Sequence, residues 1–517
     1  MISWRKSMIR VDQEKSTLKP AGYAALIERY GLDVIPNWHI SRVTTSGTHR
    51  VDSLADVTEE VYPPHYWPGD KLGDHLEFAL KYDGTNLAIL ARLFQEAVED
   101  DLVKYVRSKP NGKYARRMWF FYEFLTGETL PLDDLKRGNY IELLEPGEYY
   151  TISSPRRIRR QRVYDNLLGN DRFCPTVRRT TSLREFEKTD LPLRCRQVIR
   201  EYVPALVARA VKFLYTRETR STFAIERITP SATRSERFMT VLEQAGRAEF
   251  LQKQKLIELQ NEIVDFRFRE SDYRKTQNYV GEAVGLQRQR IHFACPKPED
   301  LADLTDGLEA AHLRMEDGGV PAAIHAAAVA YGFVFLHPFE DGNGRIHRFL
   351  VHNVLARRDF TPSGIIIPVS AAMLENSADY DASLEAFSRR LMPLVDYTLD
   401  EVGRMTVRND TTNWYRYIDM TPQAEALFQF IERAIDTELA DELAFLKNYD
   451  EAKSSIRETV DMPDRQIDLF IRFCLQNNGR LSRCKHASHF DFLTNEEIAA
   501  MEEAVQFAYG NAKAHRT

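Results

Sequence analysis

The sequence predicts a mainly α-helical protein with a mixed α/β region at its N-terminal end. From about residue 183 to residue 404, and again over about the last hundred residues, apolar side chains recur at the spacing of helices. The region before about residue 165 mixes helical spacing with short strand-like segments. The chain has 517 residues, of which 43% are hydrophobic, and this length suits about three domains. We place these domains at residues 1–165, 166–405 and 406–517.

The N-terminal region has helix signals followed by strand signals. Residues 76–106 carry apolar side chains at helical intervals, and a second apolar segment covers residues 118–125. Residues 140–144 and 149–152 have the composition of strands and lie on either side of Pro146-Gly147. A Pro-Gly pair is typical of a turn, so we expect the two segments to form a hairpin.

The middle of the chain predicts a short hairpin and then two helices joined by a loop. Between residues 276 and 298, glycines and prolines bracket a short extended stretch. Residues 321–335 are rich in alanine and suit a closely packed interior helix. A second helical pattern begins at Arg345, so the residues between the two helices form a loop that ends at a helix N-terminus. The final region is helical again and suits either packing or dimerisation.

The loop between these helices gathers groups that suit phosphate chemistry. Residues 337–348 read H-P-F-E-D-G-N-G-R-I-H-R. A helix N-terminus favours anions, and glycines let the backbone approach a ligand closely. Arg345 and Arg348 can each grip phosphate oxygens with a forked guanidinium group. Asp341 supplies the hard oxygen ligand that Mg²⁺ prefers, and His337 can take up a proton near neutral pH.

This loop resembles the motif of the Fic-domain proteins, which reads His-x-Phe-x-Asp/Glu-Gly-Asn-Gly-Arg-x-x-Arg. Every defined position of that pattern is met here, by His337, Phe339, Asp341, Gly342, Asn343, Gly344, Arg345 and Arg348. The resemblance implies a Fic-type helical core and the transfer of AMP from ATP to a hydroxyl side chain of a target protein. An incidental polar turn between two helices is the alternative interpretation.

The resemblance also implies a role for each motif residue. His337 would deprotonate the target hydroxyl, and Asp341 would hold the Mg²⁺ ion that bridges the α- and β-phosphates. Phe339 would fix the loop to the hydrophobic core. The other motif residues would bind the phosphates. Arg345 and Arg348 would hold the β/γ end, and the phosphate oxygens would be cradled by Gly342, Asn343 and Gly344. Farther along, Tyr380 lies where Fic relatives contact the adenine and ribose, although a plain packing role fits it equally well.

Two segments outside the loop extend the resemblance. Fic proteins carry a hairpin flap that docks the target segment by strand addition, and here His292 and Phe293 close the corresponding stretch. Ordinary strand packing explains these two residues equally well.

The other segment, residues 221–227, reads S-T-F-A-I-E-R and resembles the inhibitory helix of the family, spelled Ser/Thr-x-x-x-Glu-Gly/Asn. Thr222 and Glu226 fit this pattern and lie one helical turn apart, but Arg227 stands where the family has Gly or Asn. In the family the glutamate pairs with the second motif arginine, here Arg348, and blocks the productive pose of the γ-phosphate. Because the segment precedes the motif, the chain resembles the self-inhibited class. A surface helix residue without this role is the alternative for Glu226.

Composition limits the partners. The net charge of -6 gives no overall attraction to nucleic acid or membrane, and the basic run at residues 155–162 suits a solvated loop better than a binding site. Five scattered cysteines argue for a reducing compartment. The first ten residues lack an apolar signal core, and no run approaches the ~18 apolar residues of a membrane span. We therefore predict a cytoplasmic protein, with a homodimer among the possible assemblies.

These observations lead to one main hypothesis. We expect a protein adenylyltransferase that uses ATP and Mg²⁺ to modify a Ser, Thr or Tyr of another protein and that is inhibited by its own Glu226. One alternative is removal of AMP from a modified protein, in which Glu226 would orient water and His337 would protonate the leaving hydroxyl. Another alternative is a nucleotide- or nucleic-acid-binding regulator with a silent Fic fold.

Overall fold

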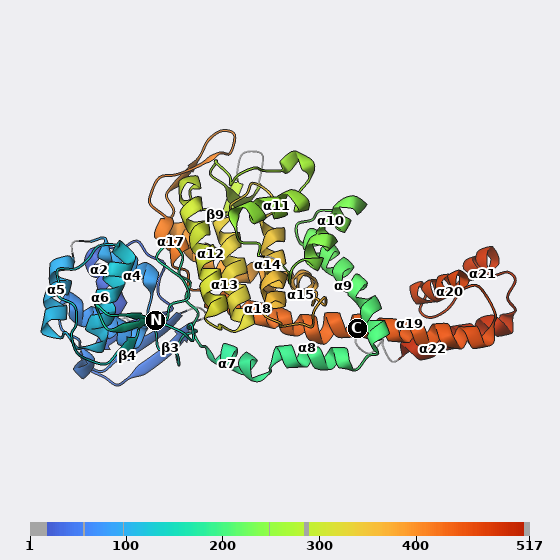
Figure 1. Cartoon of the computed structure of the whole chain (residues 1–517), viewed down its shortest axis with the longest axis horizontal. Coiled ribbons are helices and arrows are strands. Elements are labelled where there is room, and N and C mark those ends of the chain that lie inside the picture. Colours follow the sequence, from blue (N-terminus) through green and yellow to red (C-terminus); the bar gives the residue numbers. More distant parts are fainter. Residues whose placement is uncertain (1–17, 55–56, 97, 248, 284–288, 511–517) are drawn as a thin grey trace, which may run out of the picture. The chain divides into compact units, whose positions relative to one another are not determined.

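The computed structural model describes residues 18–54, 57–96, 98–247, 249–283 and 289–510. The first ten residues lie outside these ranges, and so does the turn of the hairpin that the sequence predicts between residues 276 and 298. Two compact units are present, each built from three segments of the chain (Figure 1). The first contains residues up to Lys188, Ile228–Phe360 and Asn376–Gln429, and the second contains Thr189–Arg227, Thr361–Glu375 and the residues from Phe430 onward. This grouping gives no boundary at 165 or 405, so those divisions stay predictions.

The fold is mainly α-helical, as the sequence predicts. The N-terminal part of the first unit is the mixed α/β region. Its four-stranded sheet has the order β1-β2-β4-β3, in which β2 and β4 are parallel and the other pairs are antiparallel. The helices beside it form an apolar core that includes the buried Trp119. The elements are β1 (Leu18–Pro20), α2 (Gly22–Tyr30), β2 (His39–Thr44), β3 (Arg50–Leu54), β4 (Val57–Tyr62), η1 (Pro64–Tyr66), α3 (Leu72–Phe78), η2 (Ala79–Asp83), α4 (Leu87–Phe94), α5 (Glu99–Ser108) and α6 (Lys113–Thr126).

A small three-stranded sheet follows, and it corrects the expected hairpin at residues 140–152. β5 (Ile141–Glu142) pairs in parallel with β7 (Val163–Asp165), and β6 (Arg156–Ile158) pairs with β7 in the antiparallel sense. The hairpin prediction was wrong because the second segment pairs elsewhere: Tyr149 forms an antiparallel bridge with Arg178, and the Tyr150 N–H donates to the Val177 carbonyl oxygen. Strand signals show where extended chain occurs, but the choice of partner depends on contacts farther along the chain.

The part of the first unit that carries the motif is built around one fully buried helix. This helix, α13 (Ala322–Leu336), packs against α12 (Leu301–Asp317) and α14 (Asn343–Arg357), and the three run side by side in Figure 1. α13 is apolar on every side, which is typical of an interior helix and confirms the prediction for residues 321–335. The other expected hairpin, between residues 276 and 298, is present: its strands are β8 (Tyr279–Ala283) and β9 (Gln289–Ala294).

The remaining elements complete this unit. They are α7 (Thr181–Lys188), α10 (Ala232–Glu243), α11 (Lys253–Ile263), η3 (Phe266–Phe268), η4 (Pro298–Asp300), α16 (Ser377–Leu391), η5 (Met392–Leu394), β10 (Tyr397–Leu399), β11 (Met405–Val407), α17 (Thr412–Arg416) and α18 (Thr421–Arg433), of which residues up to Gln429 belong to this unit.

The second unit is helical. Its C-terminal helices enclose a separate apolar core around Phe470 and Met501. Its elements are α8 (Leu191–Arg200), α9 (Pro204–Ile225), α15 (Val369–Glu375), η6 (Ala434–Leu439), α19 (Ala440–Thr459), α20 (Asp464–Gln476), α21 (Arg483–His489) and α22 (Asn495–Gly510). Across the ranges that the structure describes, none of the helices in either unit has the combined length and hydropathy needed to cross a bilayer.

Candidate active site

The motif loop starts and ends on residues with left-handed backbone conformation. His337 caps the C-terminal end of α13 with φ 51° and ψ 56°, and its N–H donates to the Phe333 carbonyl oxygen at 3.0 Å. Gly342 precedes α14 with φ 96°, and a Cβ at this position would lie 3.0 Å from Val264 Cγ1. Glycine is therefore required at 342 by both conformation and space. A histidine at 337 is strained in this conformation, and such strain is characteristic of functional sites.

The ring of His337 is set up to accept a proton. Its Nδ1 lies 3.2 Å from the Val334 carbonyl oxygen, which can only accept a hydrogen bond. Nδ1 must therefore carry the hydrogen in this contact, which leaves Nε2 as the basic nitrogen. Burial lowers the pKa of the imidazole to about 4, the Val334 contact opposes this shift, and the positive charge of Arg274 adds to it. The ring is thus neutral at neutral pH.

Asp341 and Arg345 form a pair one helical turn apart. Arg345 Nη2 donates to Asp341 Oδ1 at 2.5 Å, and Arg345 Nη1 donates to the Ile263 carbonyl oxygen at 3.3 Å. The Arg345 side chain is completely buried, whereas the Asp341 side chain is 39% exposed. An exposed carboxylate that uses one oxygen for an arginine keeps its other oxygen for a hard cation such as Mg²⁺.

Asn343 and Phe339 hold the loop together. The Asn343 side chain accepts a hydrogen bond from the Phe339 N–H at 3.1 Å and donates one to the Phe339 carbonyl oxygen at 2.7 Å. Phe339 is fully buried beside Tyr273 and Phe333, so it fixes the loop to the core as the family resemblance implies. Because the Asn343 amide is used in this way, its contribution to a phosphate cradle would come from its backbone N–H.

The second motif arginine and Tyr380 lie together. Arg348 Nη1 donates to Tyr380 Oη at 3.4 Å, and both side chains are almost completely buried. The Tyr380 ring also stacks on the His347 ring with a centroid separation of 6.1 Å. The structure therefore brings Tyr380 to the motif helix, although its expected contact with the adenine and ribose stays a prediction.

Three residues that the sequence analysis did not single out hold the loop from outside. Gln260 Nε2 donates to the Asp341 carbonyl oxygen at 3.3 Å, and Glu270 Oε1 accepts from the Glu340 N–H at 3.0 Å. Arg274 Nε donates to the His337 carbonyl oxygen at 2.8 Å. These residues lie more than sixty positions before the loop, and no local spacing signals such contacts.

The hairpin places its two predicted docking residues on opposite faces. Phe293 is 7% exposed and packs against Phe335 and Phe387, so its side chain belongs to the core. His292 is partly exposed, with Nε2 3.5 Å from Glu282 Oε1. Adjacent strand residues alternate in this way. If the hairpin docks a peptide, Phe293 can contribute its main chain but not its ring.

The segment expected to be inhibitory belongs to the second unit. Thr222 is fully buried in α9, and Glu226 is half-buried at the C-cap of that helix. The next residue, Arg227, is exposed and has φ 56°. In the family pattern this position is Gly or Asn, the two residues that adopt the left-handed conformation most easily after a helix. The pattern therefore reflects a backbone requirement that Arg227 meets with strain.

Comparison with known proteins identifies the region around this loop. Residues 250–355 match the Fic/DOC family. This region is a Fic domain. It includes α11, the hairpin, α12, α13, the motif loop and most of α14. The Fic motif described above lies near its C-terminal end, and the strained histidine is the first residue of that motif.

Relatives resemble part of the chain. A protein adenylyltransferase fic-1 of Caenorhabditis briggsae is 36% identical over 126 residues, which are 24% of this chain and 21% of the relative. That of Caenorhabditis elegans is 35% identical over 169 residues, or 31% of this chain and 30% of the relative. The chain thus spans less than a third of either relative. The solved structure of a Fic family protein from Desulfovibrio desulfuricans G20 is 18% identical, with a TM-score of 0.34 over 62% of this chain and 83% of that one.

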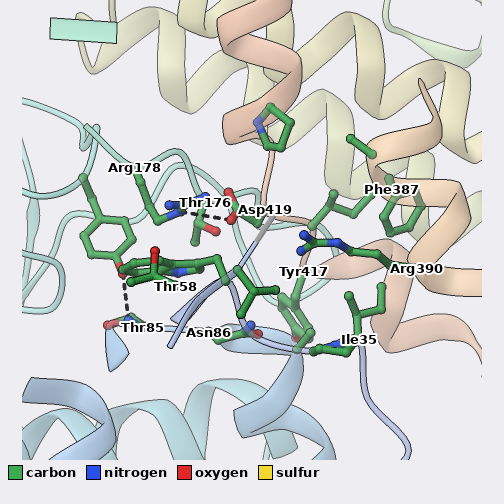
Figure 2. A pocket seen from close by; sticks show the side chains of 18 of the residues that line it. Ile35, Thr58, Thr85, Asn86, Thr176, Arg178, Phe387, Arg390, Tyr417 and Asp419 are labelled. Carbon is green, nitrogen blue, oxygen red and sulfur yellow. Dashed lines mark hydrogen bonds and ion pairs between the residues drawn. The ribbon is translucent and has the colours of Figure 1, made fainter. Parts of the chain in front are cut away.

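A separate cavity lies in the first unit. It has a volume of about 350 Å³ and is lined by residues of the N-terminal region, of α16 and of the residues around α18. In Figure 2, Arg390 extends into it from α16, and Arg178 faces Asp419. Arg178 Nε donates to Asp419 Oδ2 at 3.1 Å, and the guanidinium lies over the Trp38 ring. None of the lining residues belongs to the motif loop.

One further cluster has the composition of a metal site. Glu249, His312 and Glu316 bring ligand atoms within 4.8 Å of one another. Arg357 pairs with both of its carboxylates, because its Nη1 lies 3.4 Å from Glu249 Oε2 and its Nη2 lies 2.6 Å from Glu316 Oε2. We therefore interpret the cluster as a partly buried ion-pair network. Asp341 stays the predicted ligand for Mg²⁺.

Proposed function

We propose that this protein transfers AMP from ATP to a hydroxyl side chain of another protein. The observation that carries the proposal is the state of His337: a ring with unprotonated Nε2 stands at the start of a loop that carries an exposed carboxylate and ends at a helix N-terminus. A base, a metal ligand and an anion site are the parts that nucleotidyl transfer needs. The adenylyltransferases of both Caenorhabditis species support the same activity.

In the proposed reaction one proton is transferred, one bond forms and one bond breaks. His337 Nε2 accepts the proton of the target hydroxyl, whose oxygen forms a bond to the α-phosphorus of ATP. The bond between that phosphorus and the bridging oxygen breaks, and pyrophosphate leaves with the electron pair. The N-terminal turn of α14 faces the phosphates, and Arg348 binds their β/γ end. A Mg²⁺ ion on the exposed oxygen of Asp341 would neutralise phosphate charge when bound.

Self-inhibition belongs to the same proposal. Glu226 withholds Arg348 from the γ-phosphate, so ATP binds in a pose that is unsuited to in-line attack. Thr222 supports this segment from within α9, where its side chain is buried. The resemblance of residues 222–226 to the inhibitory helix supports this proposal. The cytoplasmic location and the homodimer stay predictions, and we expect no membrane or nucleic-acid partner.

The position of the label on ATP decides which reaction occurs. We expect protein in a cell lysate to be labelled by ATP carrying ³²P at the α-phosphate and not by ATP carrying it at the γ-phosphate. Label from the γ-phosphate would show phosphate transfer instead. Loss of label from a previously modified protein would show AMP removal, and nucleotide binding without any labelling would favour a silent regulator.

The metal ligand has its own test. Replacing Asp341 by Ala removes the exposed carboxylate, so labelling should fall steeply and lose its dependence on Mg²⁺ concentration. Glu340 is the matched control, because this neighbouring acid is exposed and its backbone is held by Glu270. Full Mg²⁺-dependent labelling by Asp341→Ala, with loss in Glu340→Ala, would move the ligand to Glu340.

A further inference from the structure

Arg274 is a buried cation that bonds only backbone carbonyl oxygens. It is 3% exposed and lies between the end of η3 and the start of β8. Its side chain donates three hydrogen bonds, from Nε to His337 O at 2.8 Å, from Nη1 to Thr276 O at 2.8 Å and from Nη2 to Pro296 O at 2.6 Å. Its own N–H donates to the Pro338 carbonyl oxygen at 2.9 Å.

These contacts join two parts of the Fic domain. Thr276 comes shortly before β8, and Pro296 comes shortly after β9, so one guanidinium binds both ends of the hairpin. The same guanidinium holds the carbonyl group of His337, the strained first residue of the motif. The planar fork of arginine fixes three acceptors in one geometry, which a flexible ammonium group does not do.

The charge of Arg274 is not balanced by a close acid. Among the residues that the structure describes, none forms a salt bridge with this guanidinium; the carboxylates of Glu340 and Glu270 attract it only from a longer distance, and burial lowers its pKa. An unpaired buried charge costs free energy even when carbonyl groups solvate it. The three hydrogen bonds to carbonyl oxygens offset part of this cost, so the position of these three acceptors depends on the guanidinium.

We propose that Arg274 is a positioning residue that holds the hairpin and the base His337 in one fixed relation. The role in catalysis rests on the proposed function, in which His337 is the base and the hairpin docks the target. Arg274 fixes the His337 carbonyl and so keeps this residue in its left-handed conformation, with the ring directed by Val334. A target strand added to the hairpin then meets the base at a set distance. Proximity of this kind is a large part of catalysis.

The positive charge has a second effect at the same place. Arg274 lies close enough to His337 to lower the pKa of the imidazole, beyond the lowering that burial causes. A cation beside the ring disfavours a second positive charge, so the base stays unprotonated at lower pH. Substitutions at Arg274 can therefore separate the effect of its hydrogen bonds from the effect of its positive charge.

The test uses the full chain with labelled histidines and needs no transfer activity. NMR titration gives the pKa of His337, and hydrogen exchange gives the protection of the hairpin amides. Arg274→Met should raise the pKa of His337 and speed exchange at both ends of the hairpin. Arg274→Lys keeps the charge without the fork, so it should speed the exchange with a smaller change in the pKa. If Arg274→Met does not fold, the lysine variant still tests the fork.

A matched control is Arg116. This arginine is also buried and donates from Nη1 to two backbone carbonyl oxygens, those of Asn139 and Arg162. Arg116→Met should lower stability without changing the His337 pKa or the hairpin exchange. An unchanged pKa and unchanged exchange in both Arg274 variants would overturn the proposal.

Labelling separates this inference from the proposed function. If AMP transfer occurs, Arg274→Lys should lower kcat by about 10²-fold with little change in the affinity for ATP, since misplacement of a reacting group costs about that much. Equal kcat in the lysine variant and the wild type would overturn the positioning role. If the wild type labels nothing, the function fails, while the titration and the exchange still decide whether Arg274 joins the hairpin to His337.

Discussion

Several helices of this protein lead into a non-glycine residue in left-handed conformation, and two of these residues, His337 and Arg227, differ in what holds them. α13 ends at His337 with φ 51°, and α9 is followed by Arg227 with φ 56°. At His337 the carbonyl group is bound by Arg274 and the ring by Val334. Arg227 is exposed, and its N–H donates to the Ala224 carbonyl oxygen. The same left-handed conformation thus occurs at His337, where neighbouring residues hold the strained backbone, and at Arg227, which is exposed to solvent.

The difference teaches how to interpret a departure from a family pattern. A left-handed residue with a side chain costs about 1–2 kcal/mol, and glycine or asparagine reduces that cost. The Gly/Asn of the inhibitory pattern therefore specifies a backbone conformation, and Arg227 keeps that conformation. The departure weakens the helix end without removing Glu226. At His337 the motif keeps a histidine where glycine would be easier, which fits the proposed role of the imidazole as the base.

The largest expected effect comes from removing the base. His337→Ala keeps a side chain in the strained conformation and removes only the ring, so labelling of protein by ATP should fall by about 10²- to 10⁴-fold. ATP affinity should stay close to that of the wild type, because the phosphate ligands remain. Calorimetry with ATP serves as the control. Undiminished labelling by this variant would contradict the proposed role of His337.

The second effect tests the other helix end. Glu226→Gly should raise self-labelling by about 10²-fold, because it frees an arginine to align the phosphates. Arg348→Ala in the same background should remove this gain, since two residues that act through one contact are not additive. Self-labelling of the wild type, both single variants and the double variant completes the cycle. Equal labelling of the wild type and Glu226→Gly would show that regulation lies outside residues 222–226.

The third effect is a dependence on pH. The pKa of His337 is lowered to about 4, so the basic ring is present above that pH. The labelling rate of Glu226→Gly should stay nearly level from about pH 7 down to pH 5, halve near pH 4 and then fall about tenfold per pH unit below it. A base with the usual pKa would begin to fail near pH 6.5. Circular dichroism at each pH excludes unfolding, which protonation of this histidine also favours as the pH falls.

The fourth effect concerns the stiffness of the motif loop. Asn343→Ala removes both hydrogen bonds to the Phe339 backbone and leaves a buried N–H and a buried carbonyl without these partners. The free energy of unfolding should fall by about 2 kcal/mol, as measured by urea denaturation. Asn353→Ala, in the same helix, is the comparison, because that side chain donates to the Ala245 carbonyl oxygen outside the loop. Only the change at Asn343 should also lower ATP affinity.

The smallest effect isolates the strain at Arg227. Arg227→Gly should raise the free energy of unfolding by about 1 kcal/mol, because glycine adopts this conformation without a steric penalty. Arg227→Ala loses the guanidinium but keeps the strain, so it should leave stability nearly unchanged. Thermal denaturation of the three proteins makes the comparison. Equal gains in both variants would assign the effect to the arginine side chain and not to the backbone.

The sequence predicted local structure better than long-range contacts. The interior helix, the hairpin and the motif loop between helices follow from spacing and turn residues, and the structure confirms them. The strand that pairs with Ile141–Glu142 could not be predicted from the sequence, because it lies about twenty residues away and the local Pro-Gly signal favoured a different pairing. Arg274 escaped notice for the same reason, since its role exists only when residues far apart in sequence meet.

The motif residues show the same limit at the level of single side chains. Residue types predicted which groups are present, but not where they point. Arg345 turns inward to Asp341 and Ile263, and the Asn343 amide closes the loop on Phe339. A conformational demand such as that at Arg227 is also invisible until the backbone is known.

The five cysteines have a practical consequence for work on this protein. Cys174, Cys195, Cys295 and Cys474 are buried, and burial raises the pKa of each thiol to about 12. Cys484, on α21, is exposed. Because the thiolate is the reactive form, a maleimide dye should attach at Cys484 alone while the protein is folded. The natural chain can therefore carry a single fluorophore, or be tethered to a surface at one point, without the removal of any cysteine.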